Sequence, residues 1–330
     1  MVNTQDASRF APMVIEGVIR PPYPVTMTLD TTSFCNARCK MCPYAELSQR
    51  LPMGTIEEAL FEKIIDDFVE LGRRYAFRPE INFCNLAEPF LDPRVIEHTQ
   101  MCLERGMEVY FNTNAQALTA QKVDRLREIG FQGRFVLNVS GITPEVYEAV
   151  MGVPQRDTLE KIDYLIERHP REKVCVQASV VGWPASEFRK AKRYWAERSV
   201  HFSPILPNSR AGLVPWLFPN TLKRVMSCGW DRVLKHIVIT FQGEVVLCCQ
   251  DMRQEVKLGN LGEQSIEEVW NGPAFRQIVE KIYRPEYSGA DLICARCEYA
   301  LPSRGPWARL KKNLRHEARK AWHLRHLWGL

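Results

Sequence analysis

The sequence has no long hydrophobic run. No apolar stretch approaches the roughly 18 residues that a membrane-spanning helix needs. The opening residues, MVNTQDASRF, do not combine a basic segment with an apolar one, so no secretory signal is visible. Internal repeats and low-complexity tracts are also lacking. These absences favour a cytoplasmic protein without a membrane span.

The basic charge is confined to one end of the chain. Eight of the 44 Lys and Arg residues, but only one of the 39 Asp and Glu residues, lie in 303–330, so this tail carries about +7. The rest, with 36 basic and 38 acidic residues, does not resemble a surface that binds nucleic acid. Segment 301–330 is predicted to be a basic C-terminal helix that docks on the body, with a membrane-interface helix or an anionic partner as alternatives. Its apolar stripe contains Leu310, Leu314, Ala318, Ala321, Trp322 and Trp328.

Strand and helix patterns alternate after a Pro-rich lead-in at 1–24. Strands are predicted at 25–32, 81–85, 108–114, 135–140, 173–180 and 201–206. Helices are predicted at 55–75, 93–105, 119–129, 144–168 and 186–197, the first with a capping box at Thr55. Six strands joined by helices predict parallel βαβ units, here an α/β fold with a partial (βα)6 barrel over 25–212.

A smaller unit is predicted over 213–300, where the alternation stops. Residues 236–249 have the pattern of a β-hairpin, and a helix follows near 265–282. The segment CARC, 294–297, then adds two cysteines.

Polar residues recur near the ends of four predicted strands, two on one face of each strand. The pairs are Asn112 and Asn114, Asn138 and Ser140, Gln177 and Ser179, and His201 and Ser203. Each residue alone could serve only to satisfy loop backbone groups. Together they predict a polar cavity at the carboxyl ends of the strands, suited to a hydroxylated ligand.

The chain has 11 cysteines, and in a cytoplasmic protein clustered cysteines indicate metal or redox sites. Cys35, Cys39 and Cys42 lie within eight residues just after the first strand. Three thiolates do not complete a tetrahedral structural zinc site, but they can hold a [4Fe–4S] cluster with one iron open to a ligand. A zinc site completed by a remote residue is the alternative. We interpret Cys84, Cys102 and Cys175 as buried apolar residues.

The pattern C-x3-C-x2-C after the first strand of a βα barrel resembles the radical S-adenosylmethionine (SAM) superfamily. This resemblance implies that the open iron binds the amino and carboxylate groups of SAM. Met41 occupies the hydrophobic position before the third cysteine. NLAEPFLDP, 85–93, resembles the family's GGEP segment, which makes Glu88 a partner for the methionine ammonium.

Two further segments carry the resemblance. NTN, with Asn112 and Asn114, resembles the family's third-strand tip, and 139–152 resembles its fourth strand and following helix. Met151 stands where an arginine is often found, so Ser140 is the candidate contact for the SAM carboxylate.

The smaller unit resembles the SPASM/twitch auxiliary-cluster domain. Its cysteines follow that order: Cys228, then Gly243-x4-Cys248, then Cys294-x2-Cys297. The resemblance implies a second, auxiliary [4Fe–4S] cluster held by these four thiolates.

Cys249 is then left over. Adjacent strand residues point to opposite faces, so Cys248 and Cys249 can hardly reach the same cluster. The resemblance to sulfatase-maturing enzymes places Cys249 where an aspartate base faces the substrate. A thiol there can instead return a hydrogen atom to a carbon radical made by the 5′-deoxyadenosyl radical. Cys249 packing in the core, or exchanging roles with Cys248, is the alternative.

This reasoning predicts an epimerase of a sugar or aminoglycoside in antibiotic biosynthesis, similar to the radical epimerases of the neomycin type. A radical dehydrogenase of an aminocyclitol or sugar, or a peptide-modifying SPASM enzyme, is the alternative. A zinc-stabilised binding protein is the third hypothesis. The lead-in is too short for a leader-peptide module, which favours a small polar substrate. An external reductant of the flavodoxin or ferredoxin type is expected as a partner.

Overall fold

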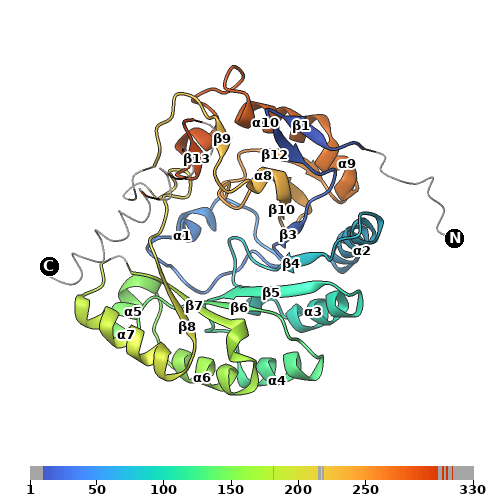
Figure 1. The fold of residues 1–330 in the computed structure, drawn as a ribbon. Helices are drawn as coiled ribbons and strands as arrows, with labels where there is room; N and C mark the ends of the chain where they lie inside the picture. The colour runs from blue at the N-terminus through green and yellow to red at the C-terminus, as the bar shows by residue number, and fades with distance from the viewer. Residues whose placement is uncertain are drawn as a thin grey trace.

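A nine-stranded sheet forms the centre of the protein. The computed structural model describes residues 10–180, 182–214, 217, 219–303, 307, 310 and 314. The strand order is β12-β11-β10-β3-β4-β5-β6-β7-β8. Figure 1 shows the strands β5–β8 and helices α3–α7 in one half and the C-terminal elements in the other.

Six neighbouring strands of this sheet are parallel and form the predicted partial barrel. They are β3 (Thr26–Leu29), β4 (Glu80–Asn82), β5 (Glu108–Thr113), β6 (Phe135–Asn138), β7 (Val174–Ser179) and β8 (His201–Ile205). The helices between them include α2 (Glu58–Arg74), α3 (Val95–Glu104), α4 (Ala120–Glu128), α6 (Thr158–Arg168) and α7 (Ala185–Glu197). The α/β fold predicted from the sequence is confirmed.

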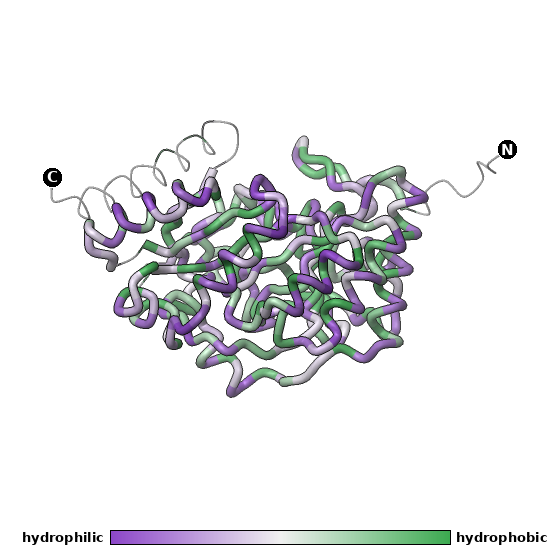
Figure 2. Tube along the Cα trace, turned by 90° about the horizontal axis from the view of Figure 1, so that it is seen from below, coloured by the Kyte–Doolittle hydropathy of each residue, from purple (hydrophilic) through white to green (hydrophobic). Residues whose placement is uncertain are grey.

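Alternation along the strands separates an apolar outer face from a more polar inner one. In β5, Val109 and Phe111 are buried, whereas Tyr110 and Asn112 are half-buried. Phe111 packs against several other phenylalanine rings, and the hydrophobic segments lie mostly inside the molecule in Figure 2. Because paired residues of neighbouring parallel strands share a face, the register of Asn138 with Gln177 gives a polar row on the inner face.

The C-terminal hairpin extends the barrel sheet directly. Strand β10 (His236–Ile239) pairs in parallel with β3, and β11 (Glu244–Val246) and β12 (Lys257–Asn260) follow in antiparallel. The ring nitrogens of His236 lie 2.6 Å from Thr26 Oγ1 and 3.0 Å from Thr28 Oγ1. Burial lowers the pKa of His236 to about 3, so this histidine is a neutral link between the two strands.

The lead-in has structure of its own. It forms a hairpin of β1 (Met13–Ile15) and β2 (Val18–Arg20) that lies beside α9 (Ile266–Asn271) and α10 (Pro273–Tyr283) in Figure 1. Arg20 is 1% exposed and donates hydrogen bonds to the carbonyls of Val233 and Trp270. The lead-in is therefore anchored on the C-terminal unit.

Three sequence predictions about helices are wrong in detail. The predicted helix 144–168 is two helices, α5 (Pro144–Met151) and α6, because Gly152 takes a left-handed conformation with φ of 68°. The helix expected near 265–282 is also two, α9 (Ile266–Asn271) and α10 (Pro273–Tyr283), separated at Gly272. Thr55 caps no helix, since α2 begins at Glu58 after an N-cap at Glu57 that makes no side-chain bond.

The remaining elements are short. They are α1 (Tyr44–Leu47), α8 (Arg232–Lys235), β9 (Ser227–Cys228), β13 (Ala300–Leu301) and the 3-10 turns Pro89–Leu91, Arg171–Lys173 and Ile293–Arg296.

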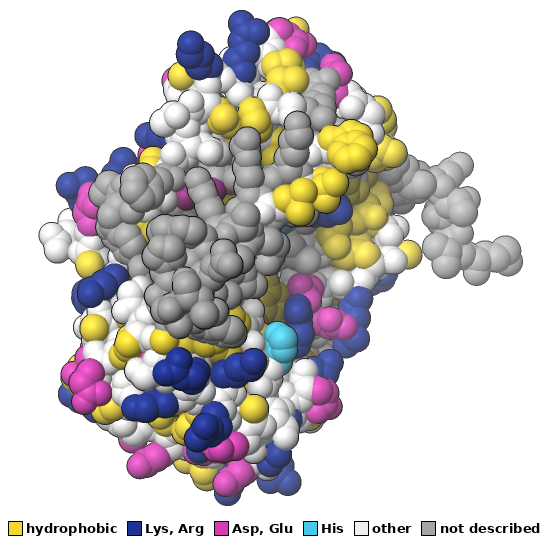
Figure 3. Space-filling model, turned by 60° about the vertical axis from the view of Figure 1, so that its left-hand side comes forward, with side chains coloured by type: hydrophobic (Ala, Val, Ile, Leu, Met, Phe, Trp, Pro, Cys, Tyr) yellow, Lys and Arg dark blue, Asp and Glu magenta, His cyan; other side chains and the backbone are white. Residues whose placement is uncertain are grey.

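The predicted C-terminal helix lies almost wholly outside the described residues. Only Trp307, Leu310 and Leu314 are described beyond 303, with helical backbone and exposed side chains. On the face shown in Figure 3, several Lys and Arg side chains lie near one another in the lower half, and most Asp and Glu side chains lie nearer the rim. No helix in the described part of the chain is long and apolar enough to cross a membrane.

Candidate active site

The loop that carries Cys35, Cys39 and Cys42 follows β3 and is fixed against α5. The amides of Arg38 and Lys40 donate to the carbonyls of Met151 and Val150 at 3.0 and 2.9 Å. Burial raises the pKa of the Cys35 thiol to about 12, and it raises the pKa values of Cys39 and Cys42 as well. The negative charges of Cys42 and Cys35 raise the pKa of Cys39 further. Buried thiols that oppose one another's ionisation fit a site in which bound iron supplies positive charge.

Side-chain amides tie this loop to the end of β5. Asn114 Nδ2 donates to Asn36 Oδ1 at 2.9 Å, and Asn36 Nδ2 donates to Gln116 Oε1 at 2.8 Å. Asn114 Oδ1 accepts from the amide of Gln116 at 3.0 Å. Since Asn36 directly follows Cys35, the predicted site residue Asn114 positions the cysteine loop.

Glu88 lies beneath the same strand end and is 2% exposed. Its Oε1 accepts from the Thr113 hydroxyl at 2.6 Å, and its Oε2 accepts from the Asn114 amide at 2.8 Å. Burial raises the pKa of Glu88 to about 7, although these hydrogen bonds act in the opposite direction. The carboxylate thus braces β5, and its contact with the methionine ammonium of SAM stays a prediction.

The other predicted SAM contacts are spread around the strand ends. Met41 is half-buried against the core, and Asn112 is half-buried on the inner face of β5. Ser140 is 4% exposed, and its Oγ accepts from the Ser179 amide at 2.9 Å. Its hydroxyl hydrogen is left for another acceptor, so the predicted bond to the SAM carboxylate is chemically open to it.

Four cysteines of the C-terminal unit line one hollow of about 410 Å³. They are Cys228 at the end of β9, Cys248 after β11, and Cys294 and Cys297 around the turn Ile293–Arg296. Burial raises the pKa of Cys248 well above its ordinary value, and Cys249, Cys294 and Cys297 add to that shift. Four convergent thiols in an apolar hollow fit a [4Fe–4S] cluster.

Cys249 does not line this hollow, although it adjoins Cys248. Gln250 donates from its backbone amide to Cys248 Sγ at 3.5 Å and from its side chain to Cys249 Sγ at 4.0 Å. Burial raises the pKa of Tyr110, on the inner face of β5, to about 12, and the charge of Cys249 adds to that shift. Cys249 therefore lies outside this hollow, and its role as a hydrogen-atom donor stays a prediction.

The cysteines are not arranged for a single metal ion. Thiolates around one tetrahedral zinc lie about 3.8 Å apart. Within the described ranges, no three His, Cys, Asp or Glu side chains are close enough to share one ion. The described residues therefore give no support to the single zinc site of the zinc-stabilised binding protein.

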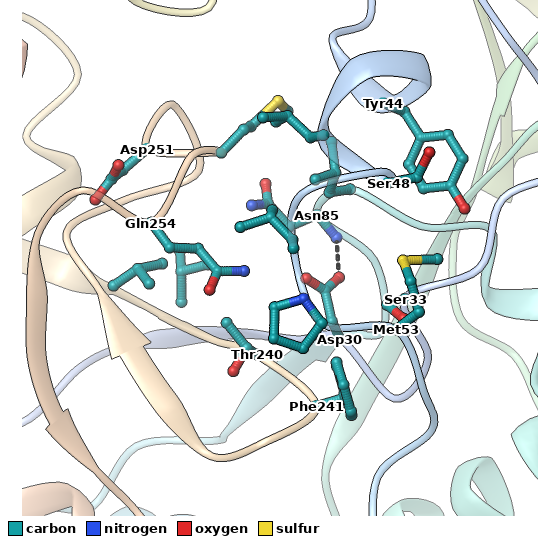
Figure 4. Close-up of a pocket in the computed structure, with 17 residues that line it drawn as sticks. Asp30, Ser33, Tyr44, Ser48, Met53, Asn85, Thr240, Phe241, Asp251 and Gln254 are labelled. Atoms are coloured by element: carbon teal, nitrogen blue, oxygen red, sulfur yellow. Dashed lines mark hydrogen bonds between the residues drawn. The ribbon is translucent and has the colours of Figure 1, made fainter.

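A second hollow, of about 520 Å³, lies between the segment after the cysteine loop and the C-terminal hairpin (Figure 4). Asp30, one residue beyond β3, is 8% exposed and points into it, and its Oδ1 accepts from the Asn85 amide at 2.6 Å. Burial raises the pKa of Asp30 to about 7. A role for Asp30 could not be predicted from the sequence, because the walls of this hollow come from segments about 200 residues apart.

Family models match both halves of the chain. The model described as the radical SAM superfamily matches residues 29–189, and the SPASM iron–sulfur cluster-binding domain matches residues 228–298. The chain belongs to the radical SAM superfamily and carries a SPASM domain. It is a radical SAM enzyme with a SAM-binding [4Fe–4S] cluster, an auxiliary cluster and SAM as cofactors.

Curated and solved relatives agree with this assignment. The S-adenosyl-L-methionine-dependent 2-deoxy-scyllo-inosamine dehydrogenase of Niallia circulans is 24% identical over 275 residues, which are 82% of this chain and 90% of that protein. BtrN in complex with AdoMet and 2-DOIA has a TM-score of 0.56 at 19% identity, over 79% of this chain and 88% of that one. SuiB of Streptococcus suis, bound to its precursor peptide SuiA, has a TM-score of 0.61 at 14% identity, over 84% and 70% of the two chains. The structural likenesses establish the fold.

Proposed function

We propose that this enzyme acts on an aminocyclitol or amino sugar and that it is a dehydrogenase which oxidises a carbon of that substrate. The comparison with the Niallia circulans dehydrogenase supports this alternative better than the epimerase that the sequence analysis placed first. The observation that carries the proposal is the hollow around Asp30. It lies between the cysteine-loop side of the barrel and the auxiliary hairpin, where a small substrate has access to both halves.

The residues of this chain have distinct tasks in that reaction. When bound, SAM and the two clusters supply a hydrogen-abstracting radical and a one-electron acceptor. Asn114 and Asn36 hold the cysteine loop at the strand ends, and Glu88 braces β5 below it. The apolar residues Leu47, Phe241 and Val246 line the hollow and limit access of water to it.

One observation favours the epimerase as a second candidate. Cys249 is half-buried and does not line the hollow formed by the other four cysteines of the C-terminal unit. A thiol in that place can return one hydrogen atom to a substrate carbon, which leaves the substrate inverted and not oxidised.

Product mass distinguishes the two outcomes. Turnover of a panel of aminocyclitols and aminoglycosides would be run anaerobically in deuterated water with SAM and a reductant. A dehydrogenase gives a product that has lost two hydrogens, and Cys249→Ala still forms it. An epimerase gives a product with one non-exchangeable deuterium, and Cys249→Ala stops its formation while SAM is still cleaved. If SAM is cleaved but none of the panel is altered, the proposed substrate class is wrong.

A further inference from the structure

We propose that Asp30 binds a protonated amino group of the substrate, so that the hollow around it selects amino compounds over their hydroxyl analogues. This inference rests on the proposed function and names the residue that recognises the substrate class. It begins from the position of Asp30, whose backbone amide donates to the carbonyl of Ile239 at 2.9 Å. The carboxylate is thus fixed where β3 meets β10, between the two halves of the enzyme.

No cation in the described lining of the hollow balances the Asp30 carboxylate. Among the described residues that line the hollow there is no Lys, Arg or His. The groups that stabilise its ionised form are backbone amides, chiefly that of Asn85, and burial opposes ionisation. A buried carboxylate without a cation is costly unless a partner arrives to pair with it.

The other carboxylate in the hollow is already used by the fold. Asp251 is fully buried and accepts from the amides of Glu255 and Val256 at 2.9 and 3.0 Å. It braces the turn between β11 and β12. Asp30 also accepts from backbone amides, but it is 8% exposed and lies in the middle of the hollow in Figure 4, so it is the carboxylate that a ligand can reach.

The rest of the wall suits a small hydroxylated amine. Ser48, Asn85 and Gln254 are half-buried and offer hydroxyl or amide groups, whereas Leu47, Val238 and Val246 form the apolar part. In Figure 4, the Asp30 carboxylate lies in the middle of these side chains. A cyclitol ring with one ammonium group matches this combination of a single charge and several neutral polar groups.

Asp30→Asn is the decisive variant. The Oδ1 of asparagine can still accept from the Asn85 amide, so the strand junction should be kept while the charge is removed. Asp251→Asn is the matched control, because it removes a carboxylate of the same hollow that already serves the backbone. Iron content and SAM affinity would be measured first and should equal those of the parent protein in Asp30→Asn.

Equilibrium binding would then be measured on the cluster-loaded, SAM-bound enzyme. The probes are 2-deoxy-scyllo-inosamine and the same ring with a hydroxyl in place of the amine. We expect the parent to prefer the amine, and Asp30→Asn to bind it about 10- to 100-fold more weakly with little change for the hydroxyl analogue. Asp251→Asn should change the affinity for both probes by the same factor.

Four results would overturn the inference. An equal loss of affinity for both probes in Asp30→Asn would mean that Asp30 maintains the shape of the hollow and does not recognise charge. A loss of SAM binding or iron would assign Asp30 to the cofactor site. If the parent binds neither probe, the aminocyclitol class in the proposed function fails together with this inference. If the parent binds the amine and Asp30→Asn binds it as tightly, only the inference fails.

Discussion

The guanidinium carbon of Arg20 lies 3.8 Å from the centre of the Trp270 ring, and Arg20 Nη2 donates to the carbonyl of the same residue at 2.7 Å. Phe275 contributes a second ring, 4.4 Å away. Burial lowers the pKa of Arg20 to about 9. Arg20 thus links the lead-in to the C-terminal unit through two aromatic rings and one backbone carbonyl.

Replacing Arg20 should destabilise the fold. We expect Arg20→Ala to lower the free energy of unfolding by about 2–4 kcal/mol, since it removes buried hydrogen bonds and cation–π contacts. Urea unfolding followed by tryptophan fluorescence measures this. Arg20→Lys keeps the charge but not the planar donors, so its free energy of unfolding should lie between those of the parent and Arg20→Ala. A loss below about 0.5 kcal/mol for the alanine variant would contradict the anchoring role.

Asp30 should make stability depend on pH. Because the folded state raises its pKa to about 7, the protonated form is favoured in the fold, and this contribution is lost as the pH rises through 7. Asp30→Asn should therefore gain stability relative to the parent as the pH rises from about 4 to about 7, by on the order of 2–4 kcal/mol, and the difference should level off above pH 7. The titratable groups near Asp30 are Cys84, Tyr44 and Asp251, and they are present in both proteins. Parallel urea unfolding curves across the pH range provide the measurement, and a constant difference would refute the expectation.

Loosening the cysteine loop should make its cluster easier to remove. Asn114→Asp keeps an acceptor for the Gln116 amide but loses the donor to Asn36. We expect an iron chelator to extract iron from this variant several-fold faster than from the parent, because the loop residue next to Cys35 is no longer held. Gln100→Ala, on the exposed side of α3, is a surface control that should leave the rate unchanged. Equal extraction rates for Asn114→Asp and the parent would show that the amide network does not hold the loop.

The two cysteine groups should lose iron independently. Cys294→Ser should remove about half of the iron and sulfide and keep SAM cleavage measurable, since the loop with Cys35 is untouched. Cys39→Ser should also remove about half, but it should abolish SAM cleavage. Cys175→Ala, a half-buried thiol on β7, should retain all the iron. If Cys294→Ser kept the full iron content, the hollow of the C-terminal unit would not hold a cluster.

The sequence predicted the barrel strands because hydrophobic period and strand alternation are local properties. The division of one helix at Gly152 could not be predicted from the sequence. A glycine ends a helix in a left-handed conformation only where the surrounding fold requires a turn, here beside the cysteine loop. A side chain at Gly152 would collide with the carbonyl oxygen of Arg38. The hydrogen bonds of Glu88 to Thr113 and Asn114, and the hollow around Asp30, depend on segments brought together only by the complete fold.

Strand β3 has β4 on one side and β10 on the other, both in parallel. The two halves of this enzyme therefore share one continuous hydrogen-bonded ladder and are not separate modules on a linker. A protein cut after residue 212 would expose the edge of β3, where Met27 and Leu29 are fully buried in the intact fold, and should aggregate. Exchange of auxiliary domains between relatives would have to conserve the register of Thr26–Leu29 with His236–Ile239, because that register sets how the auxiliary hairpin is placed against the barrel.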